Sequence, residues 1–227
     1  MDKTKDVLLL IGSPKGNCLD STSYVLGKHV INNLRAENIN SEVISIPSHL
    51  KSDSQIKKFL NKIERADTLL LSSPLYVDTL PAPVTQALEL IKENLKSITN
   101  SKNKELMVIV NCGFPESSQN RVAIQICEQF ALETGMAWLG GLAVGMGGSL
   151  SGKVIPEQGG KAKEVKEALD FLTVKIIQSE KIPEDKLPYE VEPNIPGWLY
   201  TFIGNLSWRV QALKNGCYKL LNNKPFV

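Results

Sequence analysis

The chain has 227 residues, of which 42% are hydrophobic and 22% charged, so it can bury the core of one α/β domain and carry an extension. Its 26 basic and 24 acidic side chains give a formal net charge of +2, which offers no general attraction for nucleic acid or an anionic membrane. The four cysteines are widely spaced, and no apolar run reaches the roughly 18 residues of a membrane-spanning helix. We therefore expect a cytoplasmic protein with reduced thiols and no transmembrane segment, metal site or nucleic-acid partner.

Strand and helix patterns alternate along the first three quarters of the chain. Residues 7–11 form a short apolar run that ends at Gly12, which is typical of a strand buried on both faces, and helical spacing follows over 22–37. The later predicted elements are strands 42–46, 68–71, 106–110 and 138–144 and helices 53–65, 82–96, 118–134 and 161–177. The alternation predicts an α/β fold with a doubly wound, five-stranded parallel sheet. Two strand orders fit this pattern, and both place ligands beyond the carboxyl ends of the strands.

The composition changes after residue 178. Prolines interrupt a charged stretch, which predicts an extended strap, and a helix with one apolar side is predicted over about 198–221. We therefore divide the chain into a main domain, 1–178, and an extension, 179–227. We expect the terminal helix to pack on its own domain or on a partner subunit, in a homodimer or higher homo-oligomer, rather than on a membrane surface.

The loop after the first strand is rich in groups that bind anions. It reads Gly-Ser-Pro-Lys-Gly-Asn over 12–17 and reaches a predicted helix start at Ser-Thr-Ser over 21–23. Hydroxyls, an ammonium group and the free amides of a helix N-terminus suit a phosphate. The loop matches neither the dinucleotide-binding nor the ATP-binding glycine motif. A polar turn that merely caps the helix remains the alternative.

The loop after the third strand carries a more specific pattern. Pro74, Tyr76, Thr79 and Pro81 form P-x-Y-x-x-[ST]-x-P, and residues 84–89 form V-x-x-A-[LI]-[DE]. These motifs resemble the flavin-ring loop of the NADPH-dependent FMN reductases and the related flavodoxin-like NAD(P)H:quinone oxidoreductases. The resemblance covers residues 7 to about 178 and implies the flavodoxin-like strand order 2-1-3-4-5. Taken alone, the loop could also be a rigid turn that packs Tyr76 into the core.

The resemblance also implies a cofactor, tightly bound FMN, with NAD(P)H as co-substrate. The implied residues are Ser13, Lys15, Asn17, Ser21, Thr22 and Ser23 around the phosphate, Pro74, Leu75, Tyr76 and Val77 along the flavin ring, and Asn111, Cys112 and Gly113 in a third loop near the ring. We assign no catalytic side chain. Cys112 is more simply a small buried residue at a strand end.

The expected function is transfer of electrons from NAD(P)H through FMN to a small-molecule acceptor, namely a quinone, an aromatic compound or a flavin. The first alternative is a flavodoxin-like electron carrier without a small-molecule substrate, and the second is a binding or regulatory module that keeps the fold without FMN. A glycine-rich segment, 140–153, is expected to be a lid, a contact to a second subunit or a flexible loop. His29 and His49 are isolated in the sequence, so we expect solvent or capping roles for them.

Overall fold

The computed structural model describes residues 5–95 and 104–223. It divides the chain into two compact units, Met1–Asn194 and Ile195–Val227. The strands of the first unit are β1 (Asp6–Ile11), β2 (Asn40–Ser45), β3 (Thr68–Pro74), β4 (Glu105–Asn111), β5 (Ala137–Val144) and β6 (Tyr189–Val191). Its helices are α1 (Thr22–Ala36), α2 (Ile46–His49), α3 (Asp53–Arg65), α4 (Ala82–Leu95), α5 (Arg121–Thr134) and α6 (Lys163–Gln178), and the second unit holds α7 (Gly197–Lys214).

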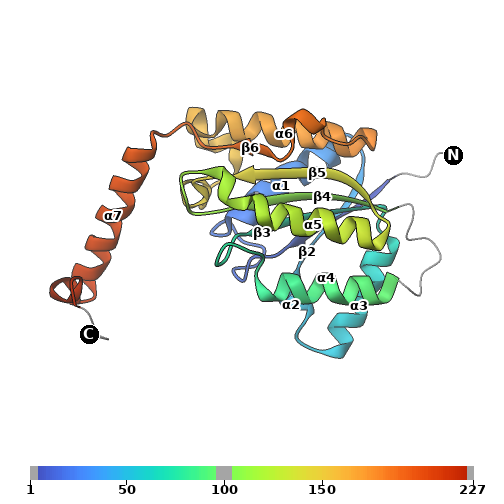
Figure 1. The fold of residues 1–227 in the computed structure, drawn as a ribbon, viewed down its shortest axis with the longest axis horizontal. Coiled ribbons are helices and arrows are strands. Elements are labelled where there is room, and N and C mark those ends of the chain that lie inside the picture. Colours follow the sequence, from blue (N-terminus) through green and yellow to red (C-terminus); the bar gives the residue numbers. More distant parts are fainter. Residues whose placement is uncertain (1–4, 96–103, 224–227) are drawn as a thin grey trace. The chain divides into compact units, whose positions relative to one another are not determined.

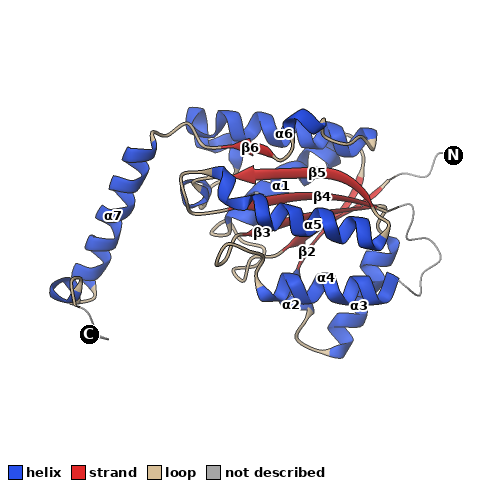
Figure 2. Cartoon of the chain, viewed as in Figure 1, coloured by secondary structure: helices blue, strands red, loops and turns tan. Residues whose placement is uncertain are grey.

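The strands form one parallel sheet in the order β2-β1-β3-β4-β5-β6 (Figures 1 and 2). The first five strands therefore have the predicted flavodoxin-like order, and the α/β class is confirmed. The predicted count of five strands was one too few. The sixth strand, β6, comes from the proline-rich strap, where three residues pair with β5.

Helices cover both faces of the sheet, with α1 and α6 on one face and α3, α4 and α5 on the other (Figure 1). Consecutive residues of a strand point to opposite faces. In β1, Leu8 and Leu10 join the core under α3 and α4, whereas Leu9 and Ile11 join the core under α1 and α6. This double burial explains why the strands read as unbroken apolar runs.

The strap packs against the main unit up to Asn194, beyond the division we drew after residue 178. Ile182 is fully buried, and its N–H donates to the carbonyl of Leu139 over 2.7 Å. Gly140 makes room for it, because a Cβ there would lie 2.7 Å from the Ile182 side chain. A strap without helical or strand periodicity gives no sign of this anchoring in the sequence.

Several element ends differ from the prediction. Strand β3 continues to Pro74, so the first residue of the predicted ring loop is the last residue of a strand. Helix α7 ends at Lys214 rather than near residue 221, because Gly216 takes a left-handed φ of +69° and the N–H of Cys217 bonds the carbonyl of Ala212. The predicted end of α4 at Lys96 lies outside the described residues.

Within residues 5–95 and 104–223, none of the helices combines the length and the apolar character needed to cross a membrane. The same residues contain no group of three or more metal-ligating side chains that could hold a metal ion.

Candidate functional site

The first loop turns sharply after β1 and leads into the start of α1. Gly16 has a left-handed φ of +68°, and its N–H donates to the carbonyl of Ser13 over 3.0 Å, which closes a tight turn. The side chain of Ser21 accepts from the N–H of Tyr24 and caps α1. The amino terminus of α1, with its partial positive charge, therefore faces the loop.

Several N–H groups of this loop have no acceptor among the described residues. The backbone amides of Asn17, Thr22 and Ser23 donate to no protein atom there, as expected for the latter two, since the first turn of a helix has no internal acceptors. The exposed Lys15 side chain adds an ammonium group, whose Nζ donates to the carbonyl of Asp20 over 3.1 Å. Such a concentration of amides and one cation has the chemistry that an anion would need.

Hydrogen bonds tie the first loop to its neighbours. The Ser23 hydroxyl donates to Asn111 Oδ1 over 2.7 Å, and the Asn111 carbonyl accepts from the N–H of Leu75 over 2.8 Å. The Thr22 hydroxyl donates to the carbonyl of Gly147 over 2.8 Å. Because a hydroxyl carries one proton, these two hydroxyls are already committed as donors. The donors left for an anion include the backbone amides, the Lys15 ammonium and the hydroxyls of Ser13 and Ser21, which only accept hydrogen bonds here.

The second loop is a two-residue hairpin with a strained tip. Tyr76 and Thr79 exchange backbone hydrogen bonds of 2.9 and 3.1 Å. Between them, Val77 and Asp78 have φ of +49° and +57°, a turn geometry that favours Asn and Gly, and strain of this kind costs about 1–3 kcal/mol per residue. Val77 is 95% exposed and Tyr76 is 45% exposed. The alternative that this turn packs Tyr76 into the core was therefore wrong.

The third loop begins with two buried residues, Asn111 and Cys112, and continues with the exposed Gly113. Asn120 donates from Nδ2 to the Cys112 sulfur over 3.4 Å, and that thiol donates to the carbonyl of Glu116 over 3.5 Å. Burial raises the pKa of the Cys112 thiol, and it outweighs the hydrogen bonds with the Phe114 carbonyl and Asn120, which lower that pKa. The group stays a neutral thiol near pH 7, which is unsuited to nucleophilic or redox chemistry.

The model of one protein family, the NADPH-dependent FMN reductases, matches residues 6–150, which contain all three loops. The chain belongs to this family. It is a flavin-dependent oxidoreductase with FMN as its cofactor and NAD(P)H as its co-substrate. Comparison with curated proteins finds no match.

Solved structures share the fold at low sequence identity. A putative quinone reductase from Klebsiella pneumoniae is 16% identical with a TM-score of 0.56, over 79% of this chain and 88% of its own. An NADH:FMN oxidoreductase, EmoB, is 14% identical with a TM-score of 0.56, over 82% and 95% of the two chains. RosB, bound to 8-demethyl-8-formylriboflavin-5′-phosphate, is 12% identical with a TM-score of 0.57, over 99% and 90%.

The residues of this FMN reductase suit both ends of the cofactor, the phosphate and the flavin ring. The first loop offers a phosphate three unpartnered amides and the Lys15 ammonium. The second and third loops expose the apolar side chains of Tyr76, Val77 and Phe114, the last of which is 51% exposed. A flat, largely apolar ring needs such a margin together with backbone groups for its polar edge.

The loop after β5 completes the surroundings of the first loop, and our list of predicted site residues omitted it. Besides the bond from Thr22 to Gly147, the N–H of Gly152 donates to the carbonyl of Leu19 over 2.7 Å. A Cβ on Gly147 would lie 2.9 Å from the carbonyl oxygen of Cys112, so only glycine fits this close approach. The glycine-rich run over 140–153 was the signal for this contact.

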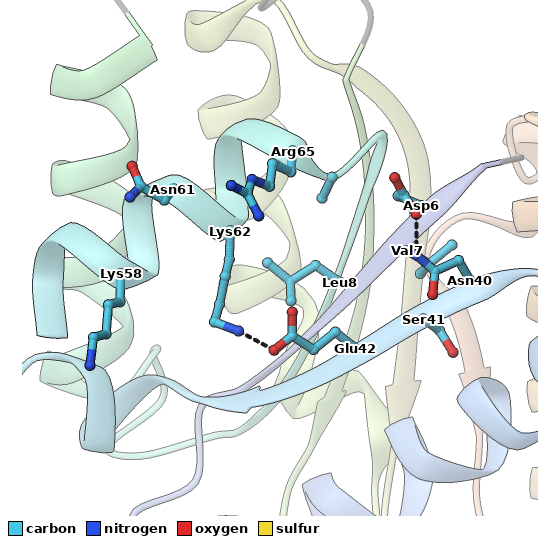
Figure 3. A pocket seen from close by; sticks show the side chains of 11 residues that line it. Asp6, Val7, Leu8, Asn40, Ser41, Glu42, Lys58, Asn61, Lys62 and Arg65 are labelled. Carbon is cyan, nitrogen blue, oxygen red and sulfur yellow. Dashed lines mark hydrogen bonds and ion pairs between the residues drawn. The ribbon is translucent and has the colours of Figure 1, made fainter. Parts of the chain in front are cut away.

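A cavity of about 480 Å³ lies elsewhere, between α3 and the amino-terminal halves of β1 and β2 (Figure 3). It is at the opposite end of the strands from the three loops. Its walls are polar, with Lys58 and Arg65 on α3 and an ion pair between Lys62 and Glu42 (Figure 3). The FMN reductase therefore has a hollow that is separate from the predicted flavin loops.

His29 is neither isolated nor solvated, contrary to our expectation. It is buried, and its Nε2 lies 2.7 Å from Asp170 Oδ1, which also accepts from Asn33 over 2.8 Å. The spacing of 141 residues hides this pair from sequence reasoning. His49 is partly exposed at the end of the short helix α2, where its Nδ1 lies 2.8 Å from the carbonyl of Ser45.

Proposed function

We propose that FMN binds across the three loops and that the enzyme passes electrons from NAD(P)H through it to a small quinone, aromatic or flavin acceptor. The observation that carries this proposal is the row of unpartnered amides in the first loop, which Asn111 links to the second loop. Bound FMN supplies the chemistry, since it accepts electrons as hydride from NAD(P)H and releases them to the acceptor.

The first loop would hold the phosphate. The amides of Asn17, Thr22 and Ser23 would donate to it, with the side chains of Lys15 and Asn17 alongside. The hydroxyls of Ser13 and Ser21 accept hydrogen bonds that shape the loop, and their protons stay free to donate to the anion. The Ser13 hydroxyl accepts from the N–H of Lys15 over 3.3 Å, and the Ser21 hydroxyl caps α1.

The second and third loops would hold the ring. Pro74, Leu75, Tyr76 and Val77 would line it along one side, and the backbone of 111–113 would supply polar partners. The exposure of the tip at Tyr76 and Val77 leaves room for a second flat molecule. This openness supports a planar acceptor such as a quinone, and NAD(P)H and the acceptor would use the same space in turn.

A thiol in the first loop gives a direct test of the phosphate position. Cys18 is exposed in this loop, and Cys217 is exposed in the terminal unit as an internal control. The rates of alkylation of the two cysteines are measured by mass spectrometry with and without saturating FMN. We expect FMN to slow modification of Cys18 at least about fivefold and to leave Cys217 unchanged. Equal rates at Cys18 in both conditions would place the phosphate elsewhere.

The acceptor is tested with the FMN-loaded enzyme under anaerobic conditions. NADH or NADPH is supplied with menadione, an azo dye or free FMN, and nucleotide oxidation is followed by absorbance. We expect catalytic turnover with at least one of these acceptors. Reduction of the bound flavin without turnover of any of them, but with rapid electron transfer to a redox protein, would instead support the electron-carrier alternative.

A further inference from the structure

The polar cavity of Figure 3 lies at the amino ends of β1 and β2, away from the three flavin loops. Its volume of about 480 Å³ is within the range of small-molecule sites. Three nearly buried residues, Val7, Leu8 and Ala66, form the apolar part of its lining, and the other lining residues are polar. A hollow of this size with several polar groups around it is a candidate binding site that the flavin chemistry does not use.

One wall of the cavity is a cationic stripe on α3. Lys58, Lys62 and Arg65 are four and three residues apart, a spacing that places them on one side of a helix. Figure 3 shows their side chains along the same wall. The helical rise puts the first and last of them about 10 Å apart along the axis. The stripe is therefore long enough to contact two phosphate groups at once.

The acidic groups of the cavity already have partners, whereas two of its cations have none. Glu42 accepts a hydrogen bond from Lys62, and Asp6 accepts one from a neighbouring side-chain amide. Lys58 and Arg65 have neither an acidic partner nor a hydrogen-bond acceptor among the residues that the structure describes. The lining holds three cations and two carboxylates, a net charge of +1. The unused polar capacity of the cavity is thus mainly cationic.

The neutral groups of the lining add donors, and the ion pair across the cavity is weak. The Ser41 hydroxyl accepts from Arg35 Nε over 3.0 Å, so its proton stays free to donate. The side chains of Lys62 and Glu42 are 32% and 54% exposed, and a pair this exposed is held by little free energy. A ligand with several negative charges can therefore take Lys62 from Glu42.

From these observations we propose that the cavity binds the diphosphate group of a small molecule. Arg65 and Lys62 hold one phosphate, for which the planar guanidinium group supplies paired donors, and Lys58 holds the other. Glu42 competes with the ligand for Lys62. The apolar part of the lining contacts the remainder of the molecule. The proposal does not depend on how FMN binds, because the three loops lie at the opposite end of the strands.

The test is a calorimetric titration of the FMN-loaded full chain with pyrophosphate. It is done at low ionic strength and without divalent cations, because salt screens exposed charges and such cations bind the probe. We expect a dissociation constant below about 1 mM. A wild type that binds no pyrophosphate up to about 10 mM would overturn the proposal.

Two substitutions should move the affinity in opposite directions. Arg65→Gln removes a cation and should weaken pyrophosphate binding at least about fivefold, whereas Glu42→Gln frees Lys62 and should tighten it at least about threefold. The matched controls are Lys57→Gln and Glu64→Gln, which make the same changes of charge at exposed positions of α3 outside the cavity. Both controls should stay within about twofold of the wild type.

The gain expected for Glu42→Gln cannot come from damage to the fold, because a damaged site would lose affinity. Changes as large in the controls as in the cavity variants would show attraction to the general charge of α3 and would overturn the proposal. Weaker binding by Glu42→Gln would also contradict it. So would binding that Asn17→Asp weakens, since this would place the probe in the first loop.

Discussion

At the scale of single residues, two buried polar side chains connect loops that lie far apart in the sequence. Ser23 donates to Asn111 across a separation of 88 residues. Both were identified as cofactor residues through the family resemblance, yet nothing in the sequence indicated that they bind each other. Motif spacing reports local geometry, whereas this contact depends on which strands are neighbours in the sheet. The same limit concealed the bond from Thr22 to Gly147.

The glycine that follows β1 should be intolerant of any side chain. A Cβ on Gly12 would lie 2.6 Å from Val84 Cγ2 and 2.7 Å from Ser73 Oγ, and both of these side chains are fully buried. We expect Gly12→Ala to lower the free energy of unfolding by about 1–3 kcal/mol, as overpacking does, and to weaken FMN binding by shifting the first loop. Urea denaturation measures the first effect and fluorescence titration the second.

Gly160→Ala is the matched control for this substitution, because a Cβ there meets no atom within 4 Å. Its unfolding free energy should stay within about 0.5 kcal/mol of the wild type. Equal stability of the two variants would show that the packing around Gly12 can relax without cost.

The thiol of Cys112 should be dispensable for turnover. Its sulfur is buried and hydrogen-bonded to the protein, and its pKa is raised by burial. We expect Cys112→Ala to keep the steady-state rate within about twofold while losing about 1 kcal/mol of stability with the lost contacts. A variant that binds FMN normally but no longer turns over would contradict this and would give the thiol a chemical role.

At the scale of elements, apolar periodicity located every major helix and the first five strands, because these segments are stabilised by burial on known faces. The structure of the strap was harder to predict from the sequence. Its strand β6 has three residues, and its anchoring depends on Ile182 entering a space that Gly140 leaves open. Helix α7 ends early, at Lys214, because Gly216 takes a left-handed φ, and the apolar pattern alone does not show this.

The contact between α1 and α6 gives a pH-dependent prediction. Asp170 on α6 meets His29 and Asn33 of α1 and pairs with Lys166. Burial raises the pKa of Asp170, but hydrogen bonds from Lys166, His29 and Asn33 together outweigh it and hold the pKa below its ordinary value. The ionised carboxylate therefore stabilises the fold above the unfolded-state pKa of about 3.9, and this contribution is lost as the pH falls through the lower native value.

We expect Asp170→Asn to lower the free energy of unfolding at pH 7 by about 0.5–1 kcal/mol, a modest value because the carboxylate is partly exposed. The difference from the wild type should shrink as the pH falls below about 4. Urea denaturation at pH 7 and pH 3.5 measures both points. The control is Glu167→Gln on the same helix, whose pairing with Lys163 is long and exposed. A difference for Asp170→Asn that does not change with pH would contradict the assignment.

At the scale of the whole molecule, the three loops meet because β1 and β3 are neighbours in the sheet. The helix that follows β1, α1, packs on one face of the sheet, and the helix that follows β3, α4, packs on the other. Such a point in a parallel sheet opens a crevice at the carboxyl ends of the strands. The sequence could predict this arrangement, since strand order and loop position follow from alternation together with the family motifs. It could not predict the environment of α7, because an apolar helix face does not specify its partner.

The most direct test of the proposed FMN site compares two ligands that differ only in the phosphate. Asn17 is exposed in the first loop, and its amide lies in the proposed anion site, so Asn17→Asp adds a negative charge with little change in shape. Affinities of the wild-type and variant apoproteins for FMN and riboflavin are measured by fluorescence titration. We predict that the variant binds FMN at least about tenfold more weakly, about 1.4 kcal/mol, and binds riboflavin as the wild type does. Unchanged FMN affinity, or equal losses for both ligands, would contradict a phosphate site in this loop.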